Sequence, residues 1–418
     1  NQMFDKLFEP IQIRGMELRN RVVMSAMGTH ESAESEDGKS VTDKLIAYHV
    51  ARAKGGNGLN TVEVTSVDAP SAPFGFLSIA EDKYISGFKK LNDAVHKAGG
   101  KTCIQLWQGG LAVASDQTAQ ILVPNDLPLS PQYTVPAITN ERLLDIIDKF
   151  GQAAKRAVEA GFDCLEFHCA HNYLPHSMLS GGINHRSDEW GGSFENRYRF
   201  AVEVVKAIKK ECGDDYPVML RYSVTSKVID FKVGAVPGEE FNEIGRDMQE
   251  SEKAAKYLQD AGYDALNADN GTYDSWYWAH PPVYMPLNCN LKEVEHIKKY
   301  VDIPVICAGR MQADVAAESI ASGNIDAVAI GRQFICDGEY LTKLKEGREE
   351  DIRPCISCHN ACLPVAYYKN SGVIMDLKDI EIDFGVIDEN GNINGLIGLD
   401  VLLELGVSID LKNLKLKL

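Results

Sequence analysis

The chain alternates short apolar runs rich in β-forming residues with segments of helical periodicity, and this alternation recurs about eight times. Each helix can carry the chain back to the start of the next strand, so the pattern favours parallel strands. The expected strands are residues 21–25, 58–65, 101–107, 163–168, 217–222, 264–268, 304–308 and 327–330. The expected helices are residues 43–54, 85–98, 140–160, 194–211, 251–261, 291–300, 313–322 and 339–346.

Three of these helices end in the same way. Gly99, Gly161 and Gly262 each follow an alanine and come just before an expected strand. A glycine at this place adopts the left-handed conformation that closes a helix. These glycines therefore support the helix ends and the strands that follow them.

Eight strand–helix units within about 350 residues fit the size of a (β/α)8 barrel. The competing architecture is a doubly wound open sheet, but no G-x-G-x-x-G follows the first strand. We therefore predict an α/β protein with a TIM barrel over residues 1–350 and a cysteine-rich segment over 351–368. A C-terminal tail, 369–418, changes in character and is expected to form a small α+β appendage, with strand-like runs at 379–387 and 407–418 around a helix-like 398–406.

Two histidines and a tyrosine follow the fourth expected strand within six residues: His168, His171 and Tyr173. Imidazole and phenol groups bind carbonyl or carboxylate oxygens and deliver protons. Barrel enzymes carry their chemistry at the carboxyl ends of the strands. The three side chains therefore predict an active site, although three exposed polar residues at a strand end would give the same pattern.

Two Gly-Arg turns close the last two strands, Gly309-Arg310 and Gly331-Arg332. In many barrels, backbone N–H groups at this place bind phosphate, and a guanidinium can add paired hydrogen bonds. We expect a phosphate site here; ordinary glycine turns with surface arginines are the alternative.

The net charge is −17, from 43 Lys and Arg against 60 Asp and Glu. A net negative charge of this size repels nucleic acid and anionic membranes, so neither is an expected partner. No apolar run approaches a membrane span, and the first residues do not start a secretory signal. The sequence therefore predicts a cytoplasmic protein.

Longer motifs resemble the Old Yellow Enzyme family of FMN-dependent ene-reductases over residues 3–362. The similarity is strongest to its iron–sulfur branch, which includes 2,4-dienoyl-CoA reductase, enoate reductases and bile-acid-pathway enoyl reductases. The motifs that carry it are residues 7–10, 18–24, 166–173, 184–193, 196–200 and 355–362.

The resemblance implies reduction of an activated C=C bond in an α,β-unsaturated carbonyl, enoate or enoyl-CoA. Hydride would come from flavin N5, and Tyr173 would give the proton to the α-carbon. His168 and His171 would bind and polarise the activating oxygen, which gains charge in the reaction. The implied electron donor is NAD(P)H. The implied FMN-binding residues are Ser25, Ala26, Met27, Gln105, Arg221, Gly309, Arg310, Gly331 and Arg332.

Three of the ten cysteines are grouped with C-x2-C-x3-C spacing, Cys355, Cys358 and Cys362. In the iron–sulfur branch this spacing holds a [4Fe–4S] cluster. The fourth cysteine of that branch has no counterpart here, because no cysteine follows Cys362. Assembly of the cluster, with a non-cysteine fourth ligand, and its loss both stay open.

Two other functions are compatible with the same residues. His168, His171 and His176 are potential metal ligands in a barrel hydrolase. The chain is also compatible with a truncated flavin-binding module that does not turn over. An ene-reductase needs a small unsaturated substrate and either direct NAD(P)H binding or an external flavoprotein as electron donor. A homo-oligomer is compatible with the reductase and with the binding module.

Overall fold

Eight parallel strands close into a barrel in the computed structural model, which describes residues 2–359, 362, 408–410 and 415–417. Neighbouring strands of the eight pair in chain order, and the last pairs with the first, so the eight strands form a closed ring. All eight expected strands are confirmed. They are β3 (Val22–Met24), β4 (Leu59–Ser66), β6 (Thr102–Trp107), β9 (Cys164–Cys169), β10 (Val218–Ser223), β13 (Ala265–Asp269), β14 (Val305–Ala308) and β15 (Ala327–Ile330).

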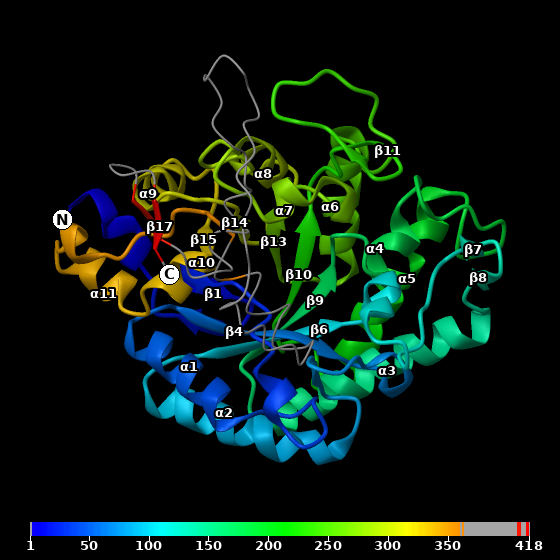
Figure 1. The fold of residues 1–418 in the computed structure, drawn as a ribbon, viewed down its shortest axis with the longest axis horizontal. Helices are drawn as coiled ribbons and strands as arrows, with labels where there is room; N and C mark the ends of the chain where they lie inside the picture. The colour runs from blue at the N-terminus through cyan, green and yellow to red at the C-terminus, as the bar shows by residue number, and fades with distance from the viewer. Residues whose placement is uncertain (1, 360–361, 363–407, 411–414, 418) are drawn as a thin grey trace. The chain divides into compact units, whose positions relative to one another are not determined.

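Helices surround the strands, as Figure 1 shows, and the chain forms the predicted TIM barrel. The larger ones are α1 (Asp43–Lys54), α2 (Ile85–Lys97), α3 (Asn140–Glu159), α5 (Phe194–Cys212), α6 (Met248–Ala261), α8 (Leu291–Lys298), α9 (Ala313–Ala321) and α11 (Tyr340–Lys345). The start of α6 lies three residues before its predicted start. Asp247 explains the difference, because its side chain accepts a hydrogen bond from Glu250 N and caps the helix.

The glycines expected to close three helices have the backbone conformation that this role requires. Their φ angles are 87° at Gly99, 92° at Gly161 and 129° at Gly262. A side chain at these angles is strained, which is why glycine ends the helix here. Each of the three turns then leads directly into β6, β9 or β13.

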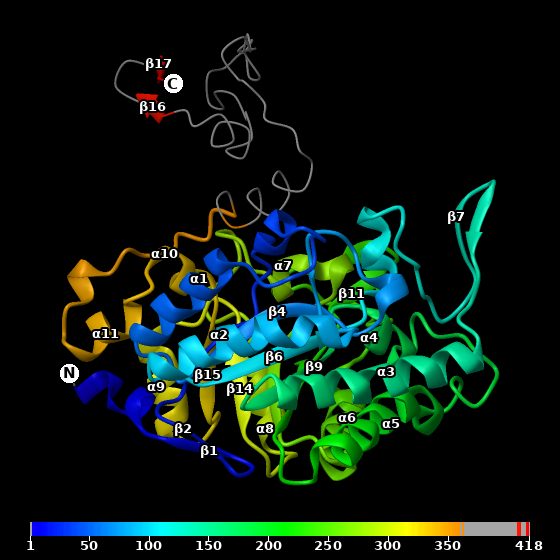
Figure 2. The same cartoon turned by 90° about the horizontal axis from the view of Figure 1, so that it is seen from below.

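An antiparallel hairpin covers the amino-terminal end of the barrel. It is formed by β1 (Ile11–Ile13) and β2 (Met16–Leu18), whose buried side chains join a cluster with the first inward-facing residues of the strands. Figure 2 shows β1 and β2 on the opposite side from α4 (Leu174–Leu179) and α7 (Trp276–Ala279), which follow the carboxyl ends of their strands. The hairpin therefore closes one end with apolar side chains.

Shorter elements lie in the connections. They are β5 (Leu77–Ser78), the β7–β8 pair (Leu127–Ser130 and Tyr133–Val135), the β11–β12 pair (Val228–Asp230 and Val233–Gly234) and α10 (Arg332–Cys336). Among the residues that the structure describes, no helix is long and apolar enough to cross a membrane.

The chain divides into two units, Asn1–Cys355 and Ile356–Leu418. Within the second unit, β16 (Ser408–Asp410) and β17 (Lys415–Lys417) pair antiparallel, inside the strand-like run predicted at 407–418. The strand-like run at 379–387 and the helix-like run at 398–406 lie outside the described residues. The segment boundaries predicted near 350 and 368 stay predictions.

Candidate active site

Alternation along the strands decides which side chains face the barrel interior, because successive residues point to opposite faces of a sheet. The first inward layer is apolar and packs on the hairpin. Further along the same strands, the inward positions hold Gln105, Glu166, Arg221 and Asn267, followed by Trp107, His168, Ser223 and Asp269. In register, Gln105 pairs with Glu166, and Arg221 pairs with His168 and Asn267. Polar groups therefore gather toward the carboxyl-terminal mouth of the barrel.

Glu166 is an inward-facing residue of β9 and is fully buried. Its carboxylate accepts hydrogen bonds from Gln105 Nε2 at 2.7 Å and from Asn267 Nδ2 at 2.9 Å. Burial raises the pKa of Glu166, and the charge of Arg221 and the two amide donors oppose that rise. Because Gln105 turns its amide nitrogen to Glu166, its carbonyl oxygen is left to accept from a ligand.

Asp269, at the end of β13, joins two predicted site residues. Its Oδ2 lies 2.8 Å from His171 Nε2 and accepts a hydrogen bond from Arg221 NH2 at 2.9 Å. The carboxylate is buried, and its Oδ1 has no hydrogen-bond partner among the described residues. Asp269 was not among the sequence-predicted residues, because its partner His171 lies 98 positions away.

His168 faces the same mouth from the end of β9. It is 4% exposed, and its Nδ1 has no hydrogen-bond partner among the described residues. Burial lowers the pKa of His168 well below its usual value, and the nearby His171 and Arg221 add to this effect. A neutral imidazole with an unsatisfied nitrogen is suited to hydrogen-bonding a ligand.

Tyr173 is the residue directly before α4, and aromatic rings surround its side chain. Its ring lies 4.6 Å from that of His168 and 5.5 Å from those of Trp107 and Tyr273, edge to face in each case. Burial raises the pKa of Tyr173 well above its usual value, so the group stays a protonated phenol at neutral pH. The structure thus brings His168, His171 and Tyr173 together, as the sequence predicted.

The segment after β13 forms one wall of this mouth. Trp276 stacks on Tyr273 with ring centres 4.8 Å apart, and its ring lies 6.0 Å from that of His171. Thr272 and Ser275 bond each other's backbone and hold the turn that carries Tyr273. The segment therefore lies against the site.

Glu63 is a further buried carboxylate at the mouth, on β4. It accepts hydrogen bonds from Thr29 N at 3.0 Å and Thr29 Oγ1 at 2.6 Å, and so holds the loop after β3. Burial raises the pKa of Glu63 to about 7, and the bonds from Thr29 oppose the rise. Glu63 was not among the residues predicted from the sequence, although one charge inside an apolar strand run is itself a signal.

The loop after β3 meets the end of β15, where several FMN-binding residues were predicted. Ser25 N donates to Ile330 O at 2.9 Å. A Cβ added at Gly331 would lie 3.0 Å from Met27 Sδ and 3.6 Å from Ser25 Cβ. Ser25, Met27 and Gly331 are therefore close neighbours, and Ala26 lies between the first two in the chain.

The two Gly-Arg turns lie at the ends of neighbouring strands, β14 and β15. Gly309 has a φ of 119°, and a Cβ there would lie 2.3 Å from Asn290 Nδ2, so only glycine fits. Arg310 donates to carbonyl oxygens of segment 281–285, among them Val283 O at 3.1 Å, and Arg332 donates to Pro281 O at 2.7 Å. Both guanidinium groups thus bind the same segment, an arrangement that the sequence did not indicate.

Within the described part of the chain, no three His, Cys, Asp or Glu side chains form a metal-binding group. His171 Nε2 lies against Asp269, and His176 Nδ1 accepts from Asn172 N at 2.9 Å. This geometry gives no support to the metal-dependent hydrolase. Cys355, Cys358 and Cys362 are partly exposed.

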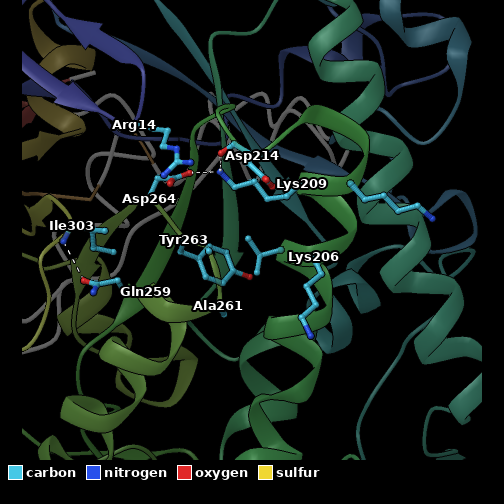
Figure 3. A pocket seen from close by; sticks show the side chains of 12 residues that line it. Arg14, Lys206, Lys209, Asp214, Gln259, Ala261, Tyr263, Asp264 and Ile303 are labelled. Atoms are coloured by element: carbon cyan, nitrogen blue, oxygen red, sulfur yellow. Dashed lines mark hydrogen bonds and ion pairs between the residues drawn. The ribbon is translucent and has the colours of Figure 1, made fainter.

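A cavity of about 580 Å³, shown in Figure 3, lies away from this mouth. It is lined by Arg14, from the hairpin turn, and by Asp264, which comes just before β13. Lys209 crosses it to Asp264 Oδ2 at 2.6 Å and also donates to two backbone carbonyls. These charges are satisfied within the protein, so the cavity does not compete as the active site.

Known proteins share both the sequence and the fold. Cinnamate reductase of Clostridium sporogenes is 40% identical, over 85% of this chain and 55% of its own length. NADPH dehydrogenase of Bacillus subtilis is 32% identical, over 80% of this chain and 93% of its own length. The structure of 2-naphthoyl-CoA reductase in complex with 2-naphthoyl-CoA aligns with a TM-score of 0.79 and 27% identity, covering 88% of this chain and 56% of that one.

The chain spans about half the length of the first of these relatives and most of the second. The profile of the NADH:flavin oxidoreductase / NADH oxidase family matches residues 6–351, which contain the barrel and every residue of the mouth described above. The chain belongs to the NADH:flavin oxidoreductase / NADH oxidase family.

Proposed function

We propose that this chain reduces an activated C=C bond of an α,β-unsaturated carbonyl, enoate or enoyl-CoA, with FMN as cofactor and NAD(P)H as electron source. One observation carries the proposal. A buried, protonated phenol, Tyr173, lies beside a neutral imidazole, His168, whose Nδ1 is unsatisfied among the described residues. A proton donor next to an oxygen-binding group is what this reaction requires.

The residues present fit FMN. The Gln105 amide, fixed by Glu166, can accept from a flavin ring N–H, and Arg221 adds a positive charge that acts on Glu166. Ser25, Ala26, Met27 and Gly331 supply backbone groups at the rim. We assign the phosphate to the turns of Gly309, Arg310, Gly331 and Arg332, where the arginines would also keep their bonds to segment 281–285.

When bound, FMN supplies the hydride. We assign the protein's own steps as follows. His168 and His171 hold the activating oxygen and stabilise the charge that develops on it. Asp269 orients His171 through the 2.8 Å contact. Tyr173 then gives its phenolic proton to the α-carbon, which completes the addition of hydrogen across the double bond.

We propose an aromatic enoate as the first substrate to test. Trp107, Tyr273 and Trp276 line the mouth around Tyr173 and His171, and flat aromatic walls favour an aryl group. The similarity to a protein named cinnamate reductase supports the same class.

We propose that Cys355, Cys358 and Cys362 supply three thiolates to a [4Fe–4S] cluster with a non-cysteine fourth ligand. The sequence supplies no fourth cysteine after them, so three thiols without a cluster are the alternative. Electrons would enter from NAD(P)H directly or through a separate flavoprotein. Iron and sulfide analysis of anaerobically purified protein decides between cluster and thiols.

The central experiment is an anaerobic half-reaction assay on FMN-loaded protein. We expect a flavin spectrum that NADH or NADPH bleaches and that trans-cinnamate or 2-cyclohexenone restores, with one equivalent of saturated product. Bound flavin that no unsaturated acceptor reoxidises would instead identify a binding module without turnover. Absence of flavin binding would overturn the proposal as a whole.

A further inference from the structure

Tyr173 cannot act twice without regaining a proton. It is 8% exposed, and its ring is enclosed by His168, Trp107 and Tyr273. Burial of this kind slows direct exchange of the phenolic proton with water. A donor that works in every cycle therefore needs a defined route to solvent.

The titratable and charged groups around Tyr173 offer few sources of that proton. His168 on β9 is neutral and buried, and His176 on α4 has a pKa held well below its usual value by burial. His171 lies against Asp269, which also binds Arg221. Trp107 has no acidic proton to give.

Tyr273 differs from all of these. Its hydroxyl lies 2.9 Å from the Tyr173 hydroxyl, and 49% of its surface is exposed. Burial raises the pKa of Tyr273, while the hydrogen bond to Tyr173 opposes the rise. The side chain thus bridges a buried proton donor and the exterior.

The position of Tyr273 is fixed on several sides. The turn that carries it is held by Thr272 N, which donates to Ser275 Oγ at 2.9 Å, and by Ser275 Oγ, which donates to Ser226 O at 2.6 Å. Its ring stacks on Trp276. A phenol held this firmly keeps the oxygen–oxygen contact short enough for proton transfer.

We propose that Tyr273 is a proton-relay residue that reprotonates Tyr173 after each reduction, an inference that rests on the proposed function. After Tyr173 has lost its proton to the α-carbon, the Tyr173 phenolate takes the proton of Tyr273. Tyr273 in turn takes one from water. The relay moves one proton per cycle and no electrons, so it needs no further reactant.

The test separates the first turnover from later ones in Tyr273→Phe, which keeps the ring and its stacking on Trp276. FMN-loaded protein is reduced with dithionite and mixed with trans-cinnamate in a stopped-flow spectrometer. We expect a first turnover within about 2-fold of wild type, since Tyr173 already carries its proton. With excess dithionite, later turnovers should slow by about 10-fold to 100-fold.

Rescue by small acids distinguishes a proton relay from a packing role, because an added acid can replace a lost proton donor but not lost packing. Imidazolium buffer, raised at constant pH and ionic strength, should speed the later turnovers of Tyr273→Phe and leave wild type unchanged. Tyr300→Phe is the matched control, because this tyrosine follows α8 on the same connection and is 39% exposed. It should behave as wild type, and FMN affinity measured by flavin fluorescence should be equal in all three proteins.

The outcomes separate failure of the relay from failure of the proposed function. Later turnovers within 2-fold of wild type would overturn the relay, and so would an equal slowing of the first turnover, which would mean that Tyr273 shapes the pocket. If reduced wild type is not reoxidised by cinnamate or 2-cyclohexenone, the proposed function itself fails. These results are distinguishable because the wild-type reaction is measured first.

Discussion

The two ends of the barrel are built from the same strands but treat polar groups differently. At the amino-terminal end, the hairpin covers an apolar layer, and nearby charges such as Lys209 and Asp264 are paired. At the carboxyl-terminal mouth, His168 Nδ1 and Asp269 Oδ1 are buried without hydrogen-bond partners among the described residues.

Unsatisfied buried polar atoms cost free energy, so a fold keeps them only where another requirement holds them. The apolar layer and the paired charges stabilise the barrel at one end, and the unsatisfied atoms at the mouth are left ready for ligands. Substitutions at the two ends should therefore affect different properties, and three of the four predictions below test that separation. The prediction at Glu63 tests how a hydrogen-bonded carboxylate at the mouth affects stability.

The largest effect is expected at the mouth from Tyr173→Phe. Loss of the phenolic proton should slow alkene reduction by about 10²–10⁴-fold, the usual contribution of a general acid. FMN affinity and flavin reduction by NAD(P)H should stay within about 2-fold of wild type. Stopped-flow half-reactions measure both; unchanged reoxidation by cinnamate would remove Tyr173 from its assigned role.

At the opposite end, Lys209→Met should affect stability and leave the chemistry alone. The pair with Asp264 is 12% and 10% exposed, and breaking a buried ion pair from one side costs about 3–5 kcal/mol. Urea unfolding measures the change. Lys206→Met is the control, since its pair with Glu203 is exposed and worth at most about 1 kcal/mol. Equal losses from the two variants would contradict the prediction.

Glu63 should make stability depend on pH. Its pKa is raised from 4.5 to about 7 in the folded chain, so the folded state holds the proton that the unfolded state releases. Relative to Glu63→Gln, the wild-type free energy of unfolding should fall by about 3 kcal/mol as pH rises from 4.5 to 7. Urea titrations across this range measure the free energy of unfolding of the two proteins. If it changes with pH equally in both, Glu63 titrates normally.

A smaller effect is expected from Asp269→Asn. An amide oxygen can still accept from His171 or Arg221, but the charge that strengthens both bonds is lost. We expect about 10-fold weaker binding of cinnamate, which corresponds to about 1.4 kcal/mol. Asp260→Asn, at an exposed ion pair, should not change it. Calorimetric titration measures both, and equal affinities would mean that Asp269 does not orient the oxygen-binding pair.

Much of the fold was accessible from the sequence because its signals are local. Apolar runs gave the eight strands, and Gly99, Gly161 and Gly262 marked helix ends through their own backbone conformation. The start of α6 was less well predicted, since Asp247 caps it before the apolar periodicity begins.

The candidate site also contains residues that local sequence predicted and residues that it did not. His168, His171 and Tyr173 were predicted because they follow one strand within six residues. Asp269, Glu63 and Tyr273 were missed or left without a role, since each acts on a residue from another strand or loop. The predicted roles of the FMN-binding residues stay predictions.

The sequence by itself determined the order of strands and helices, the family and the strand end that carries the histidines and the tyrosine. Those properties follow from periodicity and from motifs within short stretches of chain. Only the tertiary structure decided that Asp269 meets His171 and that Tyr273 meets Tyr173, 100 residues away. Such contacts depend on barrel closure and loop placement, which bring together side chains that no local pattern relates.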